Sequence, residues 1–115
     1  FELTGRMKDF YDIYYLSRTF DFDGLKLQAA IYETLKQRGT PYDEHSFNRI
    51  GTLADNEDMK KRWRYFLKTI KDDSLDFSFV VSEIQTFIEP VYKAMVSEKK
   101  WMCRWESSSQ TWLQE

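Results

Sequence analysis

Hydrophobic positions recur along most of the chain with the spacing of α-helices. The first segment, from Thr4 or Gly5 to Arg18, places aromatic and aliphatic side chains on a broad side and charged ones on a narrow edge. A second helix is predicted to follow Asp23, a favourable N-cap, and to end at Gly39, a frequent C-terminal residue. The positions that repeat at helical spacing between these two residues are Leu27, Ala30, Ile31, Thr34 and Leu35.

Three further helices are predicted in the second half of the chain. After a turn that contains proline, one short helix is expected over residues 43–50. A strongly basic helix follows Asp55 or Asn56, and the longest helix follows Asp76 and runs from Phe77 to Met95. The basic helix has its apolar positions at Met59, Trp63, Phe66, Leu67 and Ile70.

Two features complicate the end of the chain. Pro90 lies inside the longest helical pattern, so a kink near residues 86–89 or two abutting helices are expected. The tail WMCRWESSSQTWLQE has no clean period, and we expect Trp101, Trp105 and Trp112 to pin it onto the bundle while the serines form a loop. We find no convincing strand pattern and no internal repeat. The predicted fold class is therefore all-α, an irregular bundle of four to six helices.

Composition limits the function classes. The 115 residues suffice for one domain, and 42% hydrophobic with 17% aromatic residues excludes a disordered segment. A formal net charge of -2 gives no overall attraction to nucleic acid or to an anionic membrane, and no apolar run is long enough to span one. The single cysteine, Cys103, excludes an internal disulfide and fits a reducing compartment, so a cytoplasmic location without a membrane partner is expected.

The narrow charged edge of the first helix is the first candidate site. At about 100° per residue, Lys8, Asp12 and Asp9 fall at about 0°, 40° and 100° around the helix. Lys8 and Asp12 can form an ordinary surface ion pair. Leu16 falls inside the same arc, however, and this favours an edge that is partly covered. Two carboxylates at this spacing can share a divalent cation or divide the roles of base and orienter, while a lysine can hold a phosphate.

The basic helix is the second candidate. Its cations alternate with Trp63, Tyr65 and Phe66, a pattern that suits phosphate contacts beside a stacking face. The same pattern also describes a helix that is solvated on its charged side and buried on its aromatic side. The candidate RNA-binding residues are Lys60, Lys61, Arg64 and Lys68.

Other chemistry finds little support. His45 has no cysteine or histidine at the spacing of a zinc site, and Cys103 has no histidine base. The chain has no glycine-rich phosphate loop, no GxSxG elbow and no HExxH motif. Catalysis by this chain alone is therefore not expected.

Several strings together resemble one family. They are GRMKDFYDIYYL, FDFDG, AAIYETLKQRGT, IGTLADNEDMKKRWRYFLKTIK and VVSEIQTFIEPVY, from Arg6 to about Trp112. The chain resembles the C-terminal half of AbiEii-type nucleotidyltransferases, the toxins of type IV toxin-antitoxin and abortive-infection systems in bacteria and archaea. The most specific elements are Arg6-x-Lys8-Asp9-x-x-Asp12, the Arg38-Gly39-Thr40 turn and the Arg62-Trp63 pair.

The resemblance implies a divided active site. The family's N-terminal α/β nucleotidyltransferase domain, with its Gly-Ser motif and paired metal-binding acids, is missing from this sequence, which begins at Phe1. Lys8, Asp9 and Asp12 are then catalytic residues on an edge supported by Arg6, and no metal site is complete in this fragment. The resemblance implies magnesium and a nucleoside triphosphate in the full-length protein, neither of them bound by this fragment. It also implies transfer of a nucleotidyl group to RNA, with tRNA as the expected acceptor.

The implied partners are the chain's own N-terminal domain, tRNA and a cognate antitoxin. The fragment alone is expected to be inactive, and the charged edge should look unfinished beside Leu16, with nothing opposite it. The alternative is a non-catalytic helical module that binds RNA or a protein, in which the charged edge serves as a clasp between helices.

Overall fold

Helices make up most of the structure. The computed structural model describes residues 7–39, 51–52, 54–72 and 74–114, with only the backbone of Arg38. Within these ranges lie α1 (Met7–Thr19), α2 (Gly24–Arg38), α4 (Glu57–Thr69) and α5 (Phe77–Val96). The predicted helical fold class is confirmed. The short helix expected over residues 43–50 lies outside the described residues.

The predicted helix ends have the expected caps. The side chains of Asp23, Asn56 and Asp76 accept hydrogen bonds from backbone N–H groups in the first turns of α2, α4 and α5, at 2.9 to 3.3 Å. Gly39 ends α2 in the left-handed conformation, with φ 64°. The three polar side chains satisfy backbone N–H groups that a helix N-terminus otherwise leaves without a partner, and they thereby fix where each of these helices starts.

Helix α5 forms the centre of the molecule. It continues through Pro90 as one helix, so the alternative of two abutting helices is wrong. It packs against α1 and α2, while α4 packs against α1. Its buried residues are Phe77, Val80, Val81, Ile84, Phe87, Ile88, Val91, Tyr92 and Met95.

A small sheet lies beside the helices, and its presence corrects the expectation of an all-helical chain without strands. Strands β1 (Phe22–Asp23), β2 (Cys103–Glu106) and β3 (Thr111–Gln114) pair antiparallel in that order. Strands of two and four residues are too short to show a readable alternation. The loop expected around the serines is the hairpin turn between β2 and β3.

Tryptophans fasten this hairpin to the helices, as expected. Trp105 is 1% exposed, and its indole N–H donates to the Ser17 carbonyl at 2.7 Å. Trp112 donates to the Phe87 carbonyl at 3.0 Å, and its ring stacks on that of Phe87. The hairpin is therefore held to both α1 and α5 by tryptophan rings.

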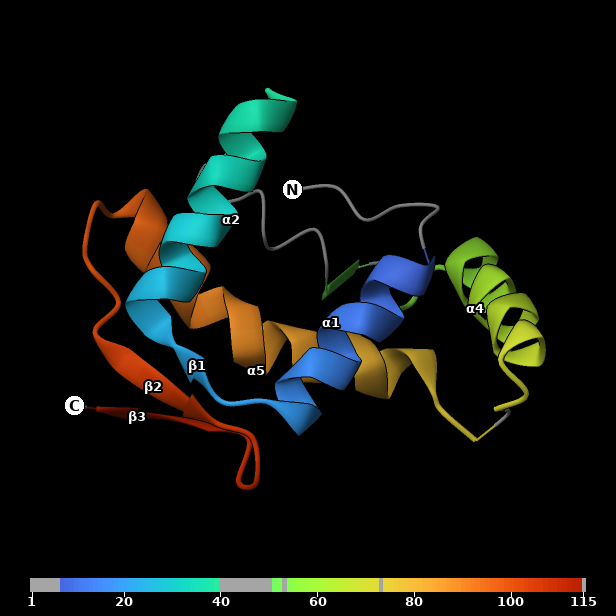
Figure 1. Cartoon of the computed structure of the whole chain (residues 1–115). Coiled ribbons are helices and arrows are strands. Elements are labelled where there is room, and N and C mark those ends of the chain that lie inside the picture. Colours follow the sequence, from blue (N-terminus) through green and yellow to red (C-terminus); the bar gives the residue numbers. More distant parts are fainter. Residues whose placement is uncertain (1–6, 40–50, 53, 73, 115) are drawn as a thin grey trace.

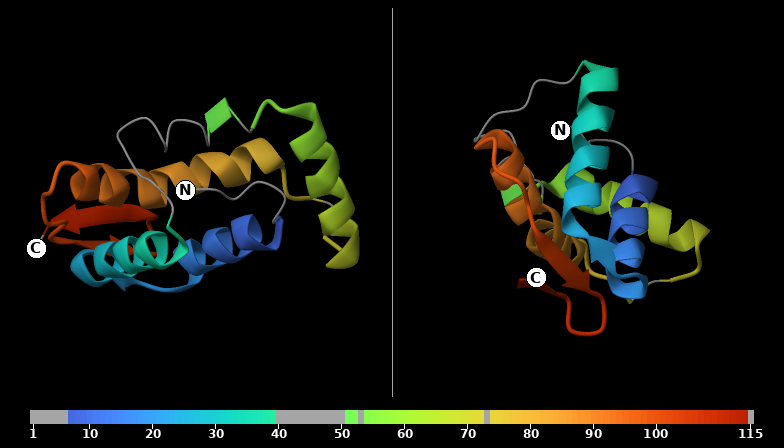
Figure 2. Two further views of the ribbon diagram at one scale, coloured as in Figure 1. Left: turned by 90° about the horizontal axis from the view of Figure 1, so that it is seen from above. Right: turned by 60° about the vertical axis from the view of Figure 1, so that its left-hand side comes forward.

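The elements form two layers with one helix across an end. Figure 1 shows α5 behind α1, and Figure 2, seen from above, shows α5 as one layer with α1 and α2 in the other. Helix α4 lies at one end of α5, near the start of α1, and the sheet lies at the other end. The molecule extends 39 × 32 × 22 Å along its three principal axes. This arrangement sets the charged start of α1 beside the basic helix.

Candidate functional site

The charged edge of α1 contains a close ion pair. Lys8 Nζ lies 2.7 Å from Asp12 Oδ2, with 77% and 44% of the two side chains exposed. The two residues are one helical turn apart, so their side chains meet on the same face. Asp12 therefore holds the ammonium group of Lys8 at the helix surface, within reach of solvent.

Asp9 is half-buried in the first turn of α1. A carboxylate in a first turn is favoured by the partial positive charge of the helix N-terminus. The charged edge is thus partly covered at Asp9, as expected. Leu16, from which this cover was inferred, is itself 39% exposed. The cover lies at the start of the helix, where α4 comes close.

A hollow of about 450 Å³ separates the start of α1 from α4. It brings together Lys8 and Asp9 with side chains that follow more than fifty residues later in the chain. The lining residues are Met7, Lys8, Asp9, Arg62, Tyr65, Phe66 and Thr69. The first turn of the edge therefore has α4 opposite it, contrary to the expectation that nothing would face it.

Aromatic packing holds α4 in this position. The Tyr11 and Phe66 rings lie 5.8 Å apart, between α1 and α4. Trp63 is 1% exposed, and the centroids of its ring and the Phe77 ring lie 5.4 Å apart. Its indole N–H donates to the Leu75 carbonyl at 2.9 Å. The prediction that the aromatic side of this helix is buried is confirmed for Trp63. Because this face of α4 is buried, its charged residues lie on the outer side.

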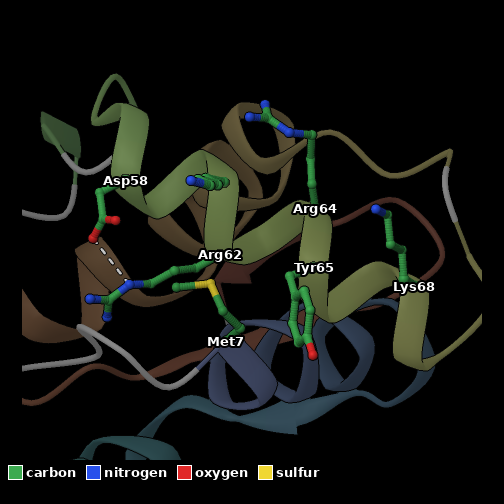
Figure 3. Close-up of a pocket in the computed structure, with 7 residues that line it drawn as sticks. Met7, Asp58, Arg62, Arg64, Tyr65 and Lys68 are labelled. Atoms are coloured by element: carbon green, nitrogen blue, oxygen red, sulfur yellow. Dashed lines mark ion pairs between the residues drawn. The ribbon is translucent and has the colours of Figure 1, made fainter.

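A second hollow, of about 620 Å³, adjoins the first. Both are lined by the same three residues, Met7, Arg62 and Tyr65. Figure 3 shows Tyr65 beside Met7, with Arg62 reaching toward Asp58 and forming an ion pair of 3.0 Å. The remaining lining residues are Lys61, Arg64 and Lys68.

The four basic residues singled out in the sequence are not all placed together. Lys61, Arg64 and Lys68 line the second hollow. Lys60 lines another hollow, toward the segment that leads into α5, which it shares with Arg64 alone of the four, and its Nζ lies 3.7 Å from Glu57. A helix turns about 100° per residue, so neighbouring lysines face different sides.

Of the other sequence candidates, only Cys103 lies within the described residues. Arg6 and His45 lie outside the described residues. Cys103 is half-buried in β2, at the other end of the molecule from α4. Within the described ranges, no group of three or more histidine, cysteine, aspartate or glutamate side chains is placed to hold a metal ion.

Sequence reasoning did not single out Met7, and it did not place Arg62 or Tyr65 opposite the charged edge of α1. Met7 belongs to the apolar side of the first helix, Tyr65 was noted only as part of a stacking face on the basic helix, and Arg62 only in the pair with Trp63. The signal that could have found Tyr65 was its position, two residues after Trp63 and thus on another side of the helix.

None of the described helices has the length and apolar character needed to cross a membrane.

Comparisons with curated proteins and with solved structures find no match. Residues 2–90 match the family model described as nucleotidyl transferase AbiEii toxin, type IV TA system. The match includes α1, α2, α4 and most of α5, and leaves the hairpin of β2 and β3 outside it. Since it spans well over half of the sequence, the chain belongs to the AbiEii nucleotidyltransferase toxin family of type IV toxin-antitoxin systems.

Proposed function

We propose that this chain is the helical part of an enzyme that transfers a nucleotidyl group from a nucleoside triphosphate to RNA, with tRNA as the acceptor. Family membership supports the reaction class. The observation that carries the assignment of the site is the hollow in which Lys8 and Asp9 of α1 face Arg62 and Tyr65 of α4. An exposed lysine beside a half-buried carboxylate in a hollow suits a charged donor and a hydroxyl acceptor.

Each residue of the edge has a distinct role in this proposal. In the transfer, the acceptor hydroxyl oxygen bonds to the α-phosphorus, the bond to the bridging oxygen breaks and pyrophosphate leaves. Asp9 orients the hydroxyl or takes its proton, and Lys8 holds the triphosphate as a point charge. Asp12, whose Oδ2 lies 2.7 Å from Lys8 Nζ, positions the ammonium group. The supporting role of Arg6 stays a prediction, because Arg6 lies outside the described residues.

Magnesium does not fit the described residues alone. The family's reaction class implies a metal for the triphosphate, yet no set of three suitable ligands converges within the described ranges, and Asp12 is paired with Lys8. In the proposal, magnesium and the triphosphate belong to the whole enzyme, whose N-terminal nucleotidyltransferase domain supplies the paired acids.

The proposed partners follow from the same assignment. The charged edge meets the enzyme's own nucleotidyltransferase domain, tRNA is the acceptor and a cognate antitoxin restrains the toxin. The alternative is a non-catalytic module that binds RNA or protein. It retains the basic hollow of α4 but gives Asp9 no part in a reaction.

Incorporation of labelled nucleotide into tRNA tests the proposal. In the enzyme that joins this helical part to its nucleotidyltransferase domain, Asp9→Ala is expected to abolish transfer, because orientation and proton removal together contribute a factor of about 10² to 10⁴ or more. The matched control is Glu33→Ala, which removes an exposed carboxylate on α2. Full transfer by a folded Asp9→Ala enzyme would falsify the assignment.

A further inference from the structure

Tyr65 has an unusual position for an aromatic residue. It is 74% exposed, the highest value among the exposed large hydrophobic side chains of the described residues. On the same helix, Trp63 is 1% exposed and Phe66 packs against the core. An aromatic ring left in water forgoes the free energy of burial, so packing does not explain its placement.

The surroundings of Tyr65 are strongly cationic. The second hollow has four basic side chains and one acid, Asp58, which is already paired with Arg62. All four basic residues, Lys61, Arg62, Arg64 and Lys68, are exposed. Lys61 and Lys68 are seven residues apart, about 10 Å along the helix. In Figure 3 the ring lies on the flank with Met7, and the Arg64 and Lys68 side chains extend along the other flank.

From this combination we propose that the hollow binds a single strand of RNA, with an unpaired base stacked on the Tyr65 ring and backbone phosphates on Lys61, Arg64 and Lys68. Cations with an exposed aromatic ring form the usual surface for unpaired nucleic acid, because every base has a flat face and every nucleotide a phosphate. An acidic peptide would satisfy the cations but has no matching partner for the ring.

A double helix fits this surface less well. In a duplex the faces of the bases are stacked on one another, so only phosphates and sugars would reach α4. Binding of a duplex would then rest on charge alone and leave the ring in water. The exposed ring is therefore the feature that distinguishes a single strand from a duplex.

The hollow also leads to the charged edge. Met7, Arg62 and Tyr65 line both hollows, so a strand stacked on Tyr65 lies directly beside Lys8 and Asp9. This inference assigns the second hollow to the acceptor RNA and so deepens the proposed function. It rests on that function for the claim that the strand runs from Tyr65 toward Lys8 and Asp9. Binding itself can be measured without any catalytic turnover.

The test uses fluorescence anisotropy with a labelled oligoadenylate RNA of about twelve nucleotides, a length within the range of single-stranded sites. We expect Tyr65→Ala to weaken binding about 5- to 100-fold, and Tyr65→Phe to retain it within about twofold, since phenylalanine keeps the ring. The control is Phe20→Ala, which removes another exposed aromatic ring, 51% exposed, outside both hollows.

Salt dependence separates the ring from the charges. The logarithm of the binding constant falls linearly with the logarithm of the salt concentration. Between about 50 and 200 mM salt, Lys68→Ala should make this slope shallower by about 0.7, because the variant neutralises one phosphate fewer. Tyr65→Ala should leave the steepness unchanged, because stacking releases no counterions. Lys36→Ala, on the exposed surface of α2, should change neither the affinity nor its salt dependence.

Three other ligands are compared with the oligoadenylate RNA in the same binding assay. A hairpin duplex of equal length should bind about tenfold more weakly, and single-stranded DNA should compete because it offers the same bases and phosphates. Equal binding by wild type and Tyr65→Ala, equal affinity for the duplex, or full displacement by polyglutamate of the same charge would each overturn the inference.

The two proposals fail in different ways. Binding that depends on Tyr65, in a whole enzyme without any transfer, supports this inference and contradicts the proposed function. Transfer whose rate and acceptor KM are unaffected by Tyr65→Ala supports the proposed function and overturns this inference.

Discussion

Lys8 and Asp12 lie 2.7 Å apart on a helix surface where water reaches both side chains. In such a position the attraction is weakened by solvent and by the loss of side-chain freedom, so the pair adds only a few tenths of a kcal/mol. Stability therefore gives little reason for these charges to stand beside Asp9. In the proposed function, the pair instead holds the ammonium group near the hollow.

Replacing Asp12 by alanine should accordingly cost little stability. We expect Asp12→Ala to lower the free energy of unfolding by less than about 0.5 kcal/mol, measured by urea titration. The control is Asp76→Ala, which removes an N-cap that accepts the Phe79 N–H at 3.1 Å and should cost about 1 kcal/mol. A drop of several degrees in melting temperature for Asp12→Ala would instead support a clasp between helices.

Asp21 is a charged residue with a structural role. Its carboxylate accepts the backbone N–H of Ser107 at 2.8 Å and the hydroxyl at 2.9 Å, and it lies 3.6 Å from Arg104. The Ser107 backbone hydrogen bond, followed by its hydroxyl and by Arg104, lowers the pKa of Asp21 below its ordinary value of 3.8. The ionised form thus ties the segment before β1 to the turn of the hairpin.

This pairing predicts a dependence of stability on pH. Because the pKa of Asp21 is lowered in the folded state, its contribution is complete above the ordinary value of 3.8 and is lost as the pH falls through and below it. The difference in urea midpoint between wild type and Asp21→Asn should be larger at about pH 7 than at about pH 3. A constant difference over that range would contradict the assignment.

At the scale of elements, helix starts and stops could be predicted because single residues determine them. Asp23, Asn56 and Asp76 act locally, and each is readable from its own position. The hairpin of β2 and β3 could not be predicted, because its strands are only four residues long and its attachment to the helices includes contacts as distant as that of Trp105 with the Ser17 carbonyl, 88 positions away. Long-range contacts of this kind leave no periodic pattern.

Gly24 shows how closely the hairpin approaches α2. A β-carbon at this position would lie 2.5 Å from the Cys103 carbonyl oxygen and 2.6 Å from Cδ1 of Trp101. We expect Gly24→Ala to lower the free energy of unfolding by about 1 to 3 kcal/mol, since β2 would have to move. Chemical denaturation monitored by tryptophan fluorescence measures this directly.

Gly39 provides the matched comparison. It has φ 64°, and no neighbouring atom of the described residues lies within 4 Å of an added β-carbon, so Gly39→Ala meets conformational strain without a clash among these residues. A cost of about 1 kcal/mol is expected, and asparagine should recover part of it because it tolerates this conformation. If Gly24→Ala left stability unchanged, the close packing of α2 on the hairpin would be wrong.

At the scale of the whole molecule, the proposed site depends on the contact between α1 and α4. The sequence identified Lys8, Asp9 and the basic helix as separate candidates, and spacing placed each on its helix face. It could not indicate that Arg62 and Tyr65 lie opposite Asp9, because that arrangement is set by aromatic packing between distant segments. The Tyr65 ring was visible in the sequence, but its exposure was not.

The chain by itself should be unable to complete the reaction. Within the described residues no three ligand groups converge, and a triphosphate without its metal lacks a large part of the stabilisation of its transition state. We expect the purified 115 residues to show no metal-dependent incorporation of labelled nucleotide. Incorporation above background would contradict the division of the active site between two domains.

The measurement that tests the central claim most directly is the single-turnover rate of nucleotidyl transfer by the whole enzyme with Asp9→Ala, taken together with its melting temperature. We expect a rate at least about 10²- to 10⁴-fold lower, nucleotide affinity within a few-fold of wild type and an unchanged melting temperature. A wild-type rate in the folded variant, or a loss of rate only in proportion to unfolding, would show that Asp9 has no part in the reaction.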